Sequence, residues 1–213
     1  MIKVNYIDHM GSDLTIVNAA RVSFNKTSDS LEERDTKLIK YLAEHDHLSP
    51  FEHCSISFMI ECPLYIRSQI QRHRTFSYNE ISRRYTSEDL VFYTPKINDI
   101  RQQSKSNRQA SEKPIGMSSA IEAQSMINDL HEKTLKTYNS LLSMGVCREQ
   151  ARGVLPQNLM TKFYMTGNLR NIAHFLQLRL HEGAQSEVRD VANQMLEIAK
   201  QYFPVSISTL MTM

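Results

Sequence analysis

The sequence predicts an α+β fold: one domain with a mainly antiparallel sheet flanked by long helices. Residues 53–61, "HCSISFMIE", alternate apolar and polar side chains, which is typical of a half-buried strand. Residues 118–144 instead place apolar side chains at helical spacing, which predicts one long helix. Strands and helices do not alternate regularly, so a doubly wound parallel sheet is not expected.

The N-terminal third is expected to contain a strand, a helix, a second strand and a second helix. Residues 2–8, "IKVNYID", alternate and predict the first strand. The helix is expected over residues 30–45, because Ser30 and Glu33 have the spacing of a capping box. Its expected inward face is Leu31, Leu38, Tyr41 and Leu42. After the strand at 53–61, Pro63 suits the first turn of a helix over 63–74, with Leu64, Ile66 and Ile70 inward.

The C-terminal part begins with a polar surface insertion at about residues 98–118, which has almost no apolar residues. The long helix follows and is expected to stop at Gly145. Its expected inward residues are Ala123, Ile127, Leu130, Thr134, Tyr138 and Leu141. The remaining expected elements are a short helix closed by Pro156, an extended segment at 161–167, a helix capped by Asn168, and a last helix over 184–202.

Composition limits the class of protein. The chain has 213 residues, enough for one domain with a core, and its net charge of +2 argues against a protein that coats nucleic acid. No apolar run is long enough to span a membrane, and the N-terminus lacks the pattern of a signal peptide. The three cysteines show no CxxC spacing and indicate reduced thiols. We expect a soluble cytoplasmic protein, or one of the host cytoplasm if it is viral.

The most unusual segment is "RHRTFSYNEISRRY", residues 72–85. Its arginines offer flat forks of donors that match phosphate and carboxylate groups. They bracket hydroxyl, amide and carboxylate side chains, which could meet the edge of a base. The alternative interpretation is a solvated basic loop with weak surface ion pairs.

A second basic group lies far away in the sequence, at Arg152 and in the segment "NLRNIAHFLQLR", residues 168–179. Arg170 and His174 are four residues apart and share a helical face, whereas Arg179 is rotated away from it. Arg152 and Arg179 sit among apolar residues, so each needs a polar or anionic partner or an exit to solvent.

Two other kinds of site are disfavoured. His45, His47, Glu52 and His53 lie close in sequence, but their spacing matches no zinc motif, and we expect no metal. Cys54 and Cys62 share the apolar register of their strand, and Cys147 leads a helix with no obvious base nearby. All three are expected to be small core residues rather than nucleophiles.

Segment 72–85 resembles the R-H-R-x-x-S-x-N-x-x-S-x-R-Y motif of flavin-dependent thymidylate synthases, with no substitution at a defined position. Similarity to that family continues in the same order at "AARVSF" (19–24), residues 33–53, "AR..LP" (151–156) and "N.R...HFL.LR" (168–179). The insertion at 98–118 shows the least similarity.

The resemblance implies an enzyme that makes dTMP from dUMP by reductive methylation. It implies 5,10-methylenetetrahydrofolate as one-carbon donor, FAD as hydride carrier and NADPH as reductant. It also implies a homotetramer with active sites shared between subunits, and no nucleic-acid or membrane partner. The mechanism of this family needs no cysteine nucleophile.

The resemblance assigns ligands to positions in this sequence. The residues expected to bind FAD are Ser23, Ser49, Arg72, His73, Arg74, Asn79, Glu80, Asn168, Arg170 and His174. Those expected to bind dUMP are Gln69, Ile70, Gln71, Arg72, Glu80, Ile81, Ser82, Arg83, Arg84, Arg152 and Arg179. Arg179 is the expected catalytic residue, since its fixed charge near the uracil edge would stabilise negative charge on N3 and O4.

Three alternatives remain. A different flavoenzyme on this scaffold would bind FAD without dUMP-dependent turnover. An RNA-binding module would use the arginines on phosphates and Phe76, Tyr78 and Tyr85 for stacking. An inactive member of the family is the third.

Overall fold

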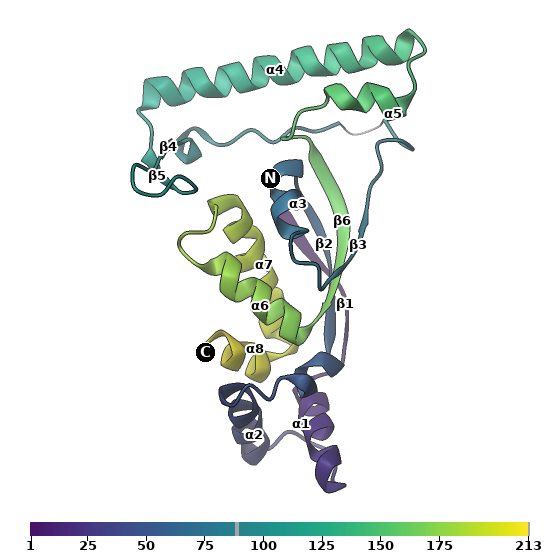
Figure 1. The fold of residues 1–213 in the computed structure, drawn as a ribbon, viewed down its shortest axis with the longest axis vertical. Coiled ribbons are helices and arrows are strands. Elements are labelled where there is room, and N and C mark those ends of the chain that lie inside the picture. Colours follow the sequence, from purple (N-terminus) through teal and green to yellow (C-terminus); the bar gives the residue numbers. More distant parts are fainter. Residues whose placement is uncertain (88–89, 213) are drawn as a thin grey trace. The chain divides into compact units, whose positions relative to one another are not determined.

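The computed structural model describes residues 1–87 and 90–212 (Figure 1). The strands are β1 Lys3–Met10, β2 Ser55–Pro63, β3 Ser77–Glu80, β4 Arg101–Gln103, β5 Ser111–Pro114 and β6 Met160–Asn168. The α-helices are α1 Asp13–Arg21, α2 Glu33–Glu44, α3 Leu64–Ile70, α4 Met117–Ser143, α5 Arg148–Ala151, α6 Leu169–Leu180, α7 Ser186–Tyr202 and α8 Pro204–Met211. The 3-10 helices are η1 Val22–Phe24, η2 Ser49–His53, η3 Ile97–Asp99 and η4 Arg152–Val154.

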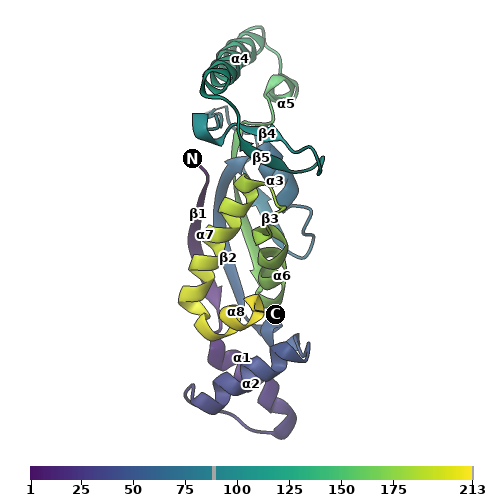
Figure 2. The ribbon, with the colours of Figure 1, turned by 90° about the vertical axis from the view of Figure 1, so that its left-hand side faces the viewer.

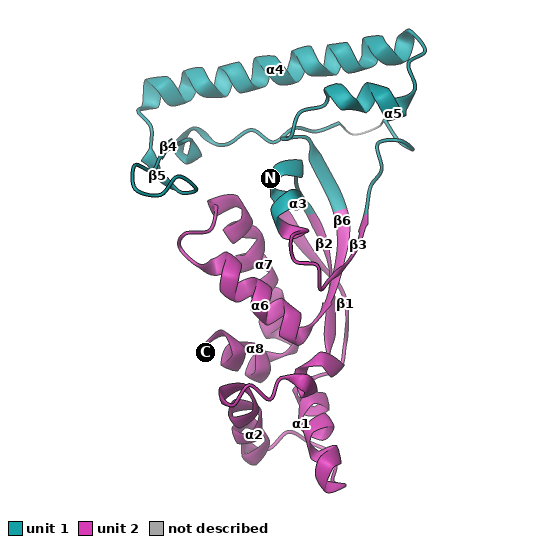
Figure 3. Cartoon of the chain, in the orientation of Figure 1, with its two compact units in different colours: residues 1, 61–69, 80–162 teal, residues 2–60, 70–79, 163–213 magenta. Residues whose placement is uncertain are grey.

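Four strands form a sheet in the order β1-β2-β6-β3, and β4 and β5 form a separate antiparallel pair. The predicted α+β class, with an antiparallel sheet and helices, is confirmed. The chain divides into two compact units (Figure 3), and β2, β3 and β6 contribute residues to both. Unit 1 contains residues 1, 61–69 and 80–162, and unit 2 contains residues 2–60, 70–79 and 163–213. The prediction of a single domain over 1–213 stays a prediction.

The core of unit 2 is built from period-two strands and helical stripes. Ile56, Phe58 and Ile60 of β2 are fully buried, as the alternation predicted. Helix α7 contacts β1 and α6, and both helices lie along the strands of this unit (Figure 2). Phe175 of α6 and Val191 of α7 are fully buried as well. Burial of these apolar side chains is the main stabilising term for the unit.

Helix α2 differs from its prediction. It begins at Glu33, with Glu32 as N-cap and Asp35 as its capping-box partner, instead of the predicted Ser30 and Glu33. The buried face is Asp35, Ile39, Leu42 and Ala43, so the predicted inward positions Leu31 and Tyr41 are wrong: they are 41% and 50% exposed. The helix is rotated because the Asp35 carboxylate is buried against Arg21.

Unit 1 contains the long helix α4, whose 27 residues match the predicted range closely. Ala120, His131, Thr134 and Tyr138 are buried, but Leu130, which was predicted inward, is 52% exposed. Gly145 has φ +87, the left-handed conformation that stops the helix as predicted. The polar insertion is exposed over most of its length and contains the β4–β5 hairpin.

Three further differences concern shorter elements. Helix α3 ends at Ile70 rather than at residue 74, because the backbone N–H of His73 closes a turn onto the Ile70 carbonyl. Strand β3 lies inside the segment that was expected to be a loop. Helices α1 and α8 were not predicted at all.

Helix α8 depends on a carboxylate from α1. The Asp13 oxygens, in a side chain that is 4% exposed, accept hydrogen bonds from the backbone N–H groups of Val205 and Ser206, both at 3.0 Å, and from the Ser206 hydroxyl. Asp13→Ala should lower the free energy of unfolding by about 3 kcal/mol, because three donors lose a charged acceptor. Urea denaturation measures this. Asp29→Ala, at an exposed site of the same unit, should change stability little, and equal losses in both variants would contradict the assigned capping role.

Candidate active site

Residues 72–76, the first part of the basic segment, have a fixed conformation within unit 2. Phe76 packs against Gly167 of β6, where an added Cβ would lie 2.3 Å from the Phe76 ring. The Tyr78 hydroxyl lies 2.9 Å from the His73 carbonyl and 3.1 Å from the Ile70 carbonyl. The Asn171 side chain donates to the Thr75 carbonyl at 3.1 Å. The turn therefore has a defined shape, although Arg72 and Arg74 are exposed on it.

His73 is the centre of a cluster in unit 2. Arg179 Nε donates to His73 Nε2 at 2.9 Å, and the His174 and Phe175 rings lie 6.3 and 4.8 Å from its ring centre. Burial, together with the charges of Arg179 and His174, lowers the pKa of His73 to about 4. A neutral imidazole can accept the Arg179 hydrogen bond at Nε2, which a protonated one could not.

Arg179 therefore has the polar partner that its apolar neighbours required. Helical spacing alone places Arg179 on a different face of α6 from His174. His73, from another segment, accepts a hydrogen bond from Arg179, and its ring centre lies 6.3 Å from that of His174. Burial lowers the pKa of Arg179, yet a guanidinium stays charged at any working pH. The cluster joins a permanent cation to a neutral imidazole at a half-buried position.

The start of helix α6 holds two more expected residues. Asn168 caps the helix as predicted, with its side-chain oxygen 2.9 Å from the Asn171 backbone nitrogen. Arg170 forms an ion pair with Glu52 of η2 at 2.6 Å, and both side chains are about half exposed. Glu52 was noted in the sequence only as one of several close acidic and histidine residues. Among the described residues, no group of three or more potential metal ligands is found.

Unit 1 contains a pocket of about 370 Å³ that brings the second part of the basic segment together with Arg152. Its lining residues are Leu64, Arg67, Glu80, Ile81, Ser82, Arg83, Arg84, Arg152, Leu155, Leu159, Met160 and Thr161. Four arginines and one carboxylate over an apolar floor suit a small ligand that carries an anionic group. Five of the expected dUMP-binding side chains from 80–84 therefore line one cavity.

The carboxylate of Glu80 is held from two sides. Arg67 Nε lies 3.1 Å from Glu80 Oε1, and the Thr161 hydroxyl donates to the same oxygen at 2.6 Å. Beneath them, burial and then the Glu80 charge raise the pKa of the Cys62 thiol to about 12. Sequence reasoning missed Arg67 and Thr161. Arg67 could have been noticed as the one charged residue in the otherwise uncharged segment 63–71.

The other expected residues are placed as follows. Ser23, Ser49 and Asn79 are exposed in unit 2, and Gln69 and Gln71 are partly buried in units 1 and 2. The Ile70 side chain is fully buried at the core position that its helical spacing predicted, and its expected contact with dUMP stays a prediction.

The fold is α+β, and the sites described are an arginine-rich pocket with one carboxylate in unit 1 and a cluster of arginine and histidine side chains in unit 2. The family described as "Thymidylate synthase complementing protein" matches residues 5–205. The chain is 42% identical over 203 residues to a flavin-dependent thymidylate synthase of Thermus thermophilus, a region that covers 95% of this chain and 73% of the relative. It is 40% identical over 204 residues to the enzyme of the same description from Wolbachia pipientis, covering 95% of this chain and 71% of the relative.

A solved structure agrees. The crystal structure of the UMP/dUMP methylase PolB from Streptomyces cacaoi, bound with 5-Br dUMP, has a TM-score of 0.91 and 32% identity, covering 100% of this chain and 95% of that one. This chain belongs to the flavin-dependent thymidylate synthase family. Membership confirms the predicted enzyme class, a methyltransferase that depends on FAD. No helix long and apolar enough to cross a membrane occurs within residues 1–87 and 90–212.

The low pKa of His73 predicts a pH dependence of stability. Its pKa is about 4 when folded and about 6.5 when unfolded, so as pH falls the unfolded chain takes up this proton first. Stability should therefore fall from about pH 6.5 towards pH 4. His73→Gln should lose less stability than the parent between pH 7 and pH 5, as measured by urea denaturation. Identical slopes in the two proteins would show that His73 does not titrate in this way.

Proposed function

We propose that this protein makes dTMP from dUMP by reductive methylation, with 5,10-methylenetetrahydrofolate as one-carbon donor, FAD as hydride carrier and NADPH as reductant. The observation that supports it most is the arginine-lined pocket of unit 1, formed by the part of the basic segment expected to bind dUMP. The curated relatives are named for thymidylate synthesis, and the Streptomyces methylase was solved with 5-Br dUMP bound.

In this proposal dUMP occupies the unit 1 pocket, whose volume of about 370 Å³ is in the range of small-molecule sites. Arg83, Arg84 and Arg152 neutralise the phosphate. Ser82 and Glu80 provide polar contacts to the nucleoside, with Glu80 kept in place by Arg67 and Thr161. Glu80 also contributes to specificity for the nucleoside, since a fixed carboxylate accepts hydrogen bonds only from groups that can donate them.

The cluster of unit 2 contains hydrogen-bond donors and cations of the kinds that bind FAD. Exposed Arg72 and Arg74, together with Arg170, offer charge to a pyrophosphate, and His73 and His174 offer ring nitrogens nearby. Arg170 now pairs with Glu52 at half-exposed positions, where exchange of one anion for another costs little. Ser23, Ser49, Asn79 and Asn168 complete the proposed set of contacts from unit 2. When bound, FAD supplies the redox chemistry of the reaction.

Arg179 is the proposed catalytic residue. Its guanidinium is oriented by the hydrogen bond from Nε to neutral His73, and in this proposal the oriented cation lies at the uracil edge. There it stabilises negative charge on N3 and O4 and makes the ring more electron-rich. The buried thiols of Cys54 and Cys62 do not attack the ring in this scheme: burial raises their pKa to about 11 and about 12, which keeps them protonated.

The proposed assembly is a homotetramer whose active sites are shared between subunits. Under this arrangement the dUMP pocket and Arg179 need not come from the same chain.

UMP is the second candidate substrate, because the Streptomyces protein is described as a methylase of both UMP and dUMP. The higher identity to thymidylate synthases, 42% against 32%, favours dUMP.

Replacement of Arg152 tests the assignment of the pocket. Arg152→Ala should weaken dUMP binding about tenfold, since one charge-assisted contact to the phosphate is lost. Deoxyuridine, which lacks the phosphate, should bind equally to parent and variant, as measured by calorimetry. Arg148→Ala removes the same charge from the neighbouring helix α5 outside the pocket and should leave dUMP affinity unchanged. If both variants weaken dUMP equally, the phosphate does not lie at Arg152.

Replacement of Arg179 tests its catalytic role. Arg179→Ala should lower the turnover of dTMP formation by about 10²- to 10³-fold, because a preorganised charge at the uracil edge is removed. The flavin absorbance and the dUMP affinity report on binding in the same samples. A variant that binds both ligands and turns over at the parental rate would remove Arg179 from the mechanism.

A further inference from the structure

Unit 2 contains another pocket, of about 460 Å³, whose lining residues have no part in the proposed binding of dUMP or FAD. It is lined by Arg21, Phe24, Lys26, Thr27, Arg34 and Leu38. These residues come from the end of α1, from η1 and the chain after it, and from α2. Three of the six side chains are cationic and none is acidic.

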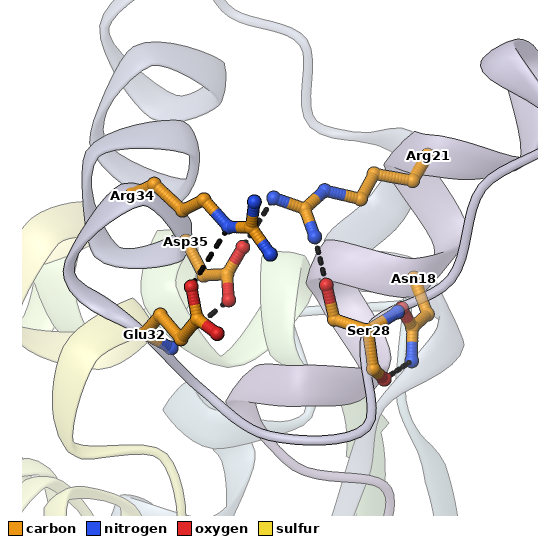
Figure 4. Close-up of polar contacts among 6 residues, drawn as sticks. All are labelled: Asn18, Arg21, Ser28, Glu32, Arg34 and Asp35. Carbon is orange, nitrogen blue, oxygen red and sulfur yellow. Dashed lines mark hydrogen bonds and ion pairs between the residues drawn. The ribbon is translucent and has the colours of Figure 1, made fainter.

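The Arg21 guanidinium of this pocket is held in place by a buried partner, whereas Arg34 makes an ion pair that is exposed to solvent. Arg21 forms an ion pair with the fully buried Asp35 and a hydrogen bond with Ser28. The Ser28 loop is fixed in turn, because the Asn18 side chain bonds to the Ser28 backbone at 2.7 and 3.0 Å. Arg34 Nε lies 2.9 Å from Glu32 Oε2. Figure 4 shows the Arg21 and Arg34 guanidinium groups pointing toward one another above the Asp35 carboxylate.

This arrangement leaves the pocket wall positive. Asp35 and Glu32 each balance one arginine, but neither lines the cavity. Lys26 is exposed, and the residues described provide no ion pair for its ammonium group. Two converging arginines and a lysine attract an oxyanion such as phosphate or carboxylate.

An exposed aromatic ring adjoins the cations. Phe24 lines the pocket and is 75% exposed, and neighbouring Val22 is 71% exposed. A ring in this position offers a stacking surface to a flat group that carries the anion. Ser23, which lies between these two residues in the sequence, is a proposed FAD contact but does not line the pocket.

We propose that this pocket binds the anionic tail of a co-substrate, an oxyanion attached to an aromatic or heterocyclic group. The inference rests on the proposed function, which requires two such co-substrates and assigns residues to neither. The anion comes either from the glutamate carboxylates of methylenetetrahydrofolate or from the 2′-phosphate of NADPH. Lys26 and Arg34 are its main contacts, with Arg21 as the oriented group behind them.

Equilibrium binding to the FAD-loaded protein tests the proposal without relying on turnover. Lys26→Ala and Arg34→Ala should each weaken one co-substrate about fivefold or more, through loss of a charge-assisted contact. For each variant, the affinity for NADPH is compared with that for NADH, and the affinity for the triglutamate form of methylenetetrahydrofolate with that for the monoglutamate form. Lys40→Ala removes an exposed charge of the same helix α2 outside the pocket and serves as the matched control. Arg21 is left intact because its partner Asp35 is buried.

These two comparisons distinguish the two possible sources of the anion. Weakened NADPH with unchanged NADH assigns the pocket to the 2′-phosphate, and weakened triglutamate with unchanged monoglutamate assigns it to folate. Unchanged affinity for every ligand, or loss of FAD from the variants, overturns the proposal. A parent protein that binds the co-substrate but forms no dTMP refutes the proposed function and not this site.

Discussion

Arginine side chains that are partly buried need hydrogen-bonding or ionic partners, and three such pairs fix the positions of functional side chains in this structure. Arg179 donates to a neutral His73, Arg67 pairs with Glu80, and Arg21 pairs with the buried Asp35. Each pair joins segments far apart in sequence or fixes the direction of a cation. Other arginines, such as Arg84 and Arg152, are exposed.

The local patterns of the sequence predicted the main elements. Alternation at 53–61 and helical spacing at 118–144 correspond to β2 and α4, and Asn168 caps α6 as expected. Helix α2 was predicted in the correct place and with Leu42 correctly inward, but the predicted inward positions Leu31 and Tyr41 are exposed. The reason is that a buried carboxylate, Asp35, occupies the core side, and its partner Arg21 is invisible to a local pattern.

Elements stabilised by distant contacts were missed. Helix α8 begins with its backbone donors on Asp13, which is close to 190 residues earlier in the chain. Strand β3 lies within a segment of polar residues whose only deeply buried anchor is Phe76, packed on Gly167. Neither α8 nor β3 is marked in the sequence by a regular spacing of apolar residues. The candidate site shows the same limit: the motif indicated Glu80 and the arginines, whereas the pairing of Glu80 with Arg67 and Thr161, and of Arg170 with Glu52, depends on contacts across the fold.

The central claim is that the basic segment and its partners serve the synthesis of dTMP. It is tested most directly by incubating the purified protein anaerobically with FAD, NADPH, 5,10-methylenetetrahydrofolate and dUMP, and by following dTMP by chromatography while each component is omitted in turn. The account predicts dTMP in the complete mixture, and none when dUMP, the folate or the reductant is left out. A flavin-loaded protein that forms no dTMP in the complete mixture would contradict the account and would indicate another flavin-dependent reaction on this fold.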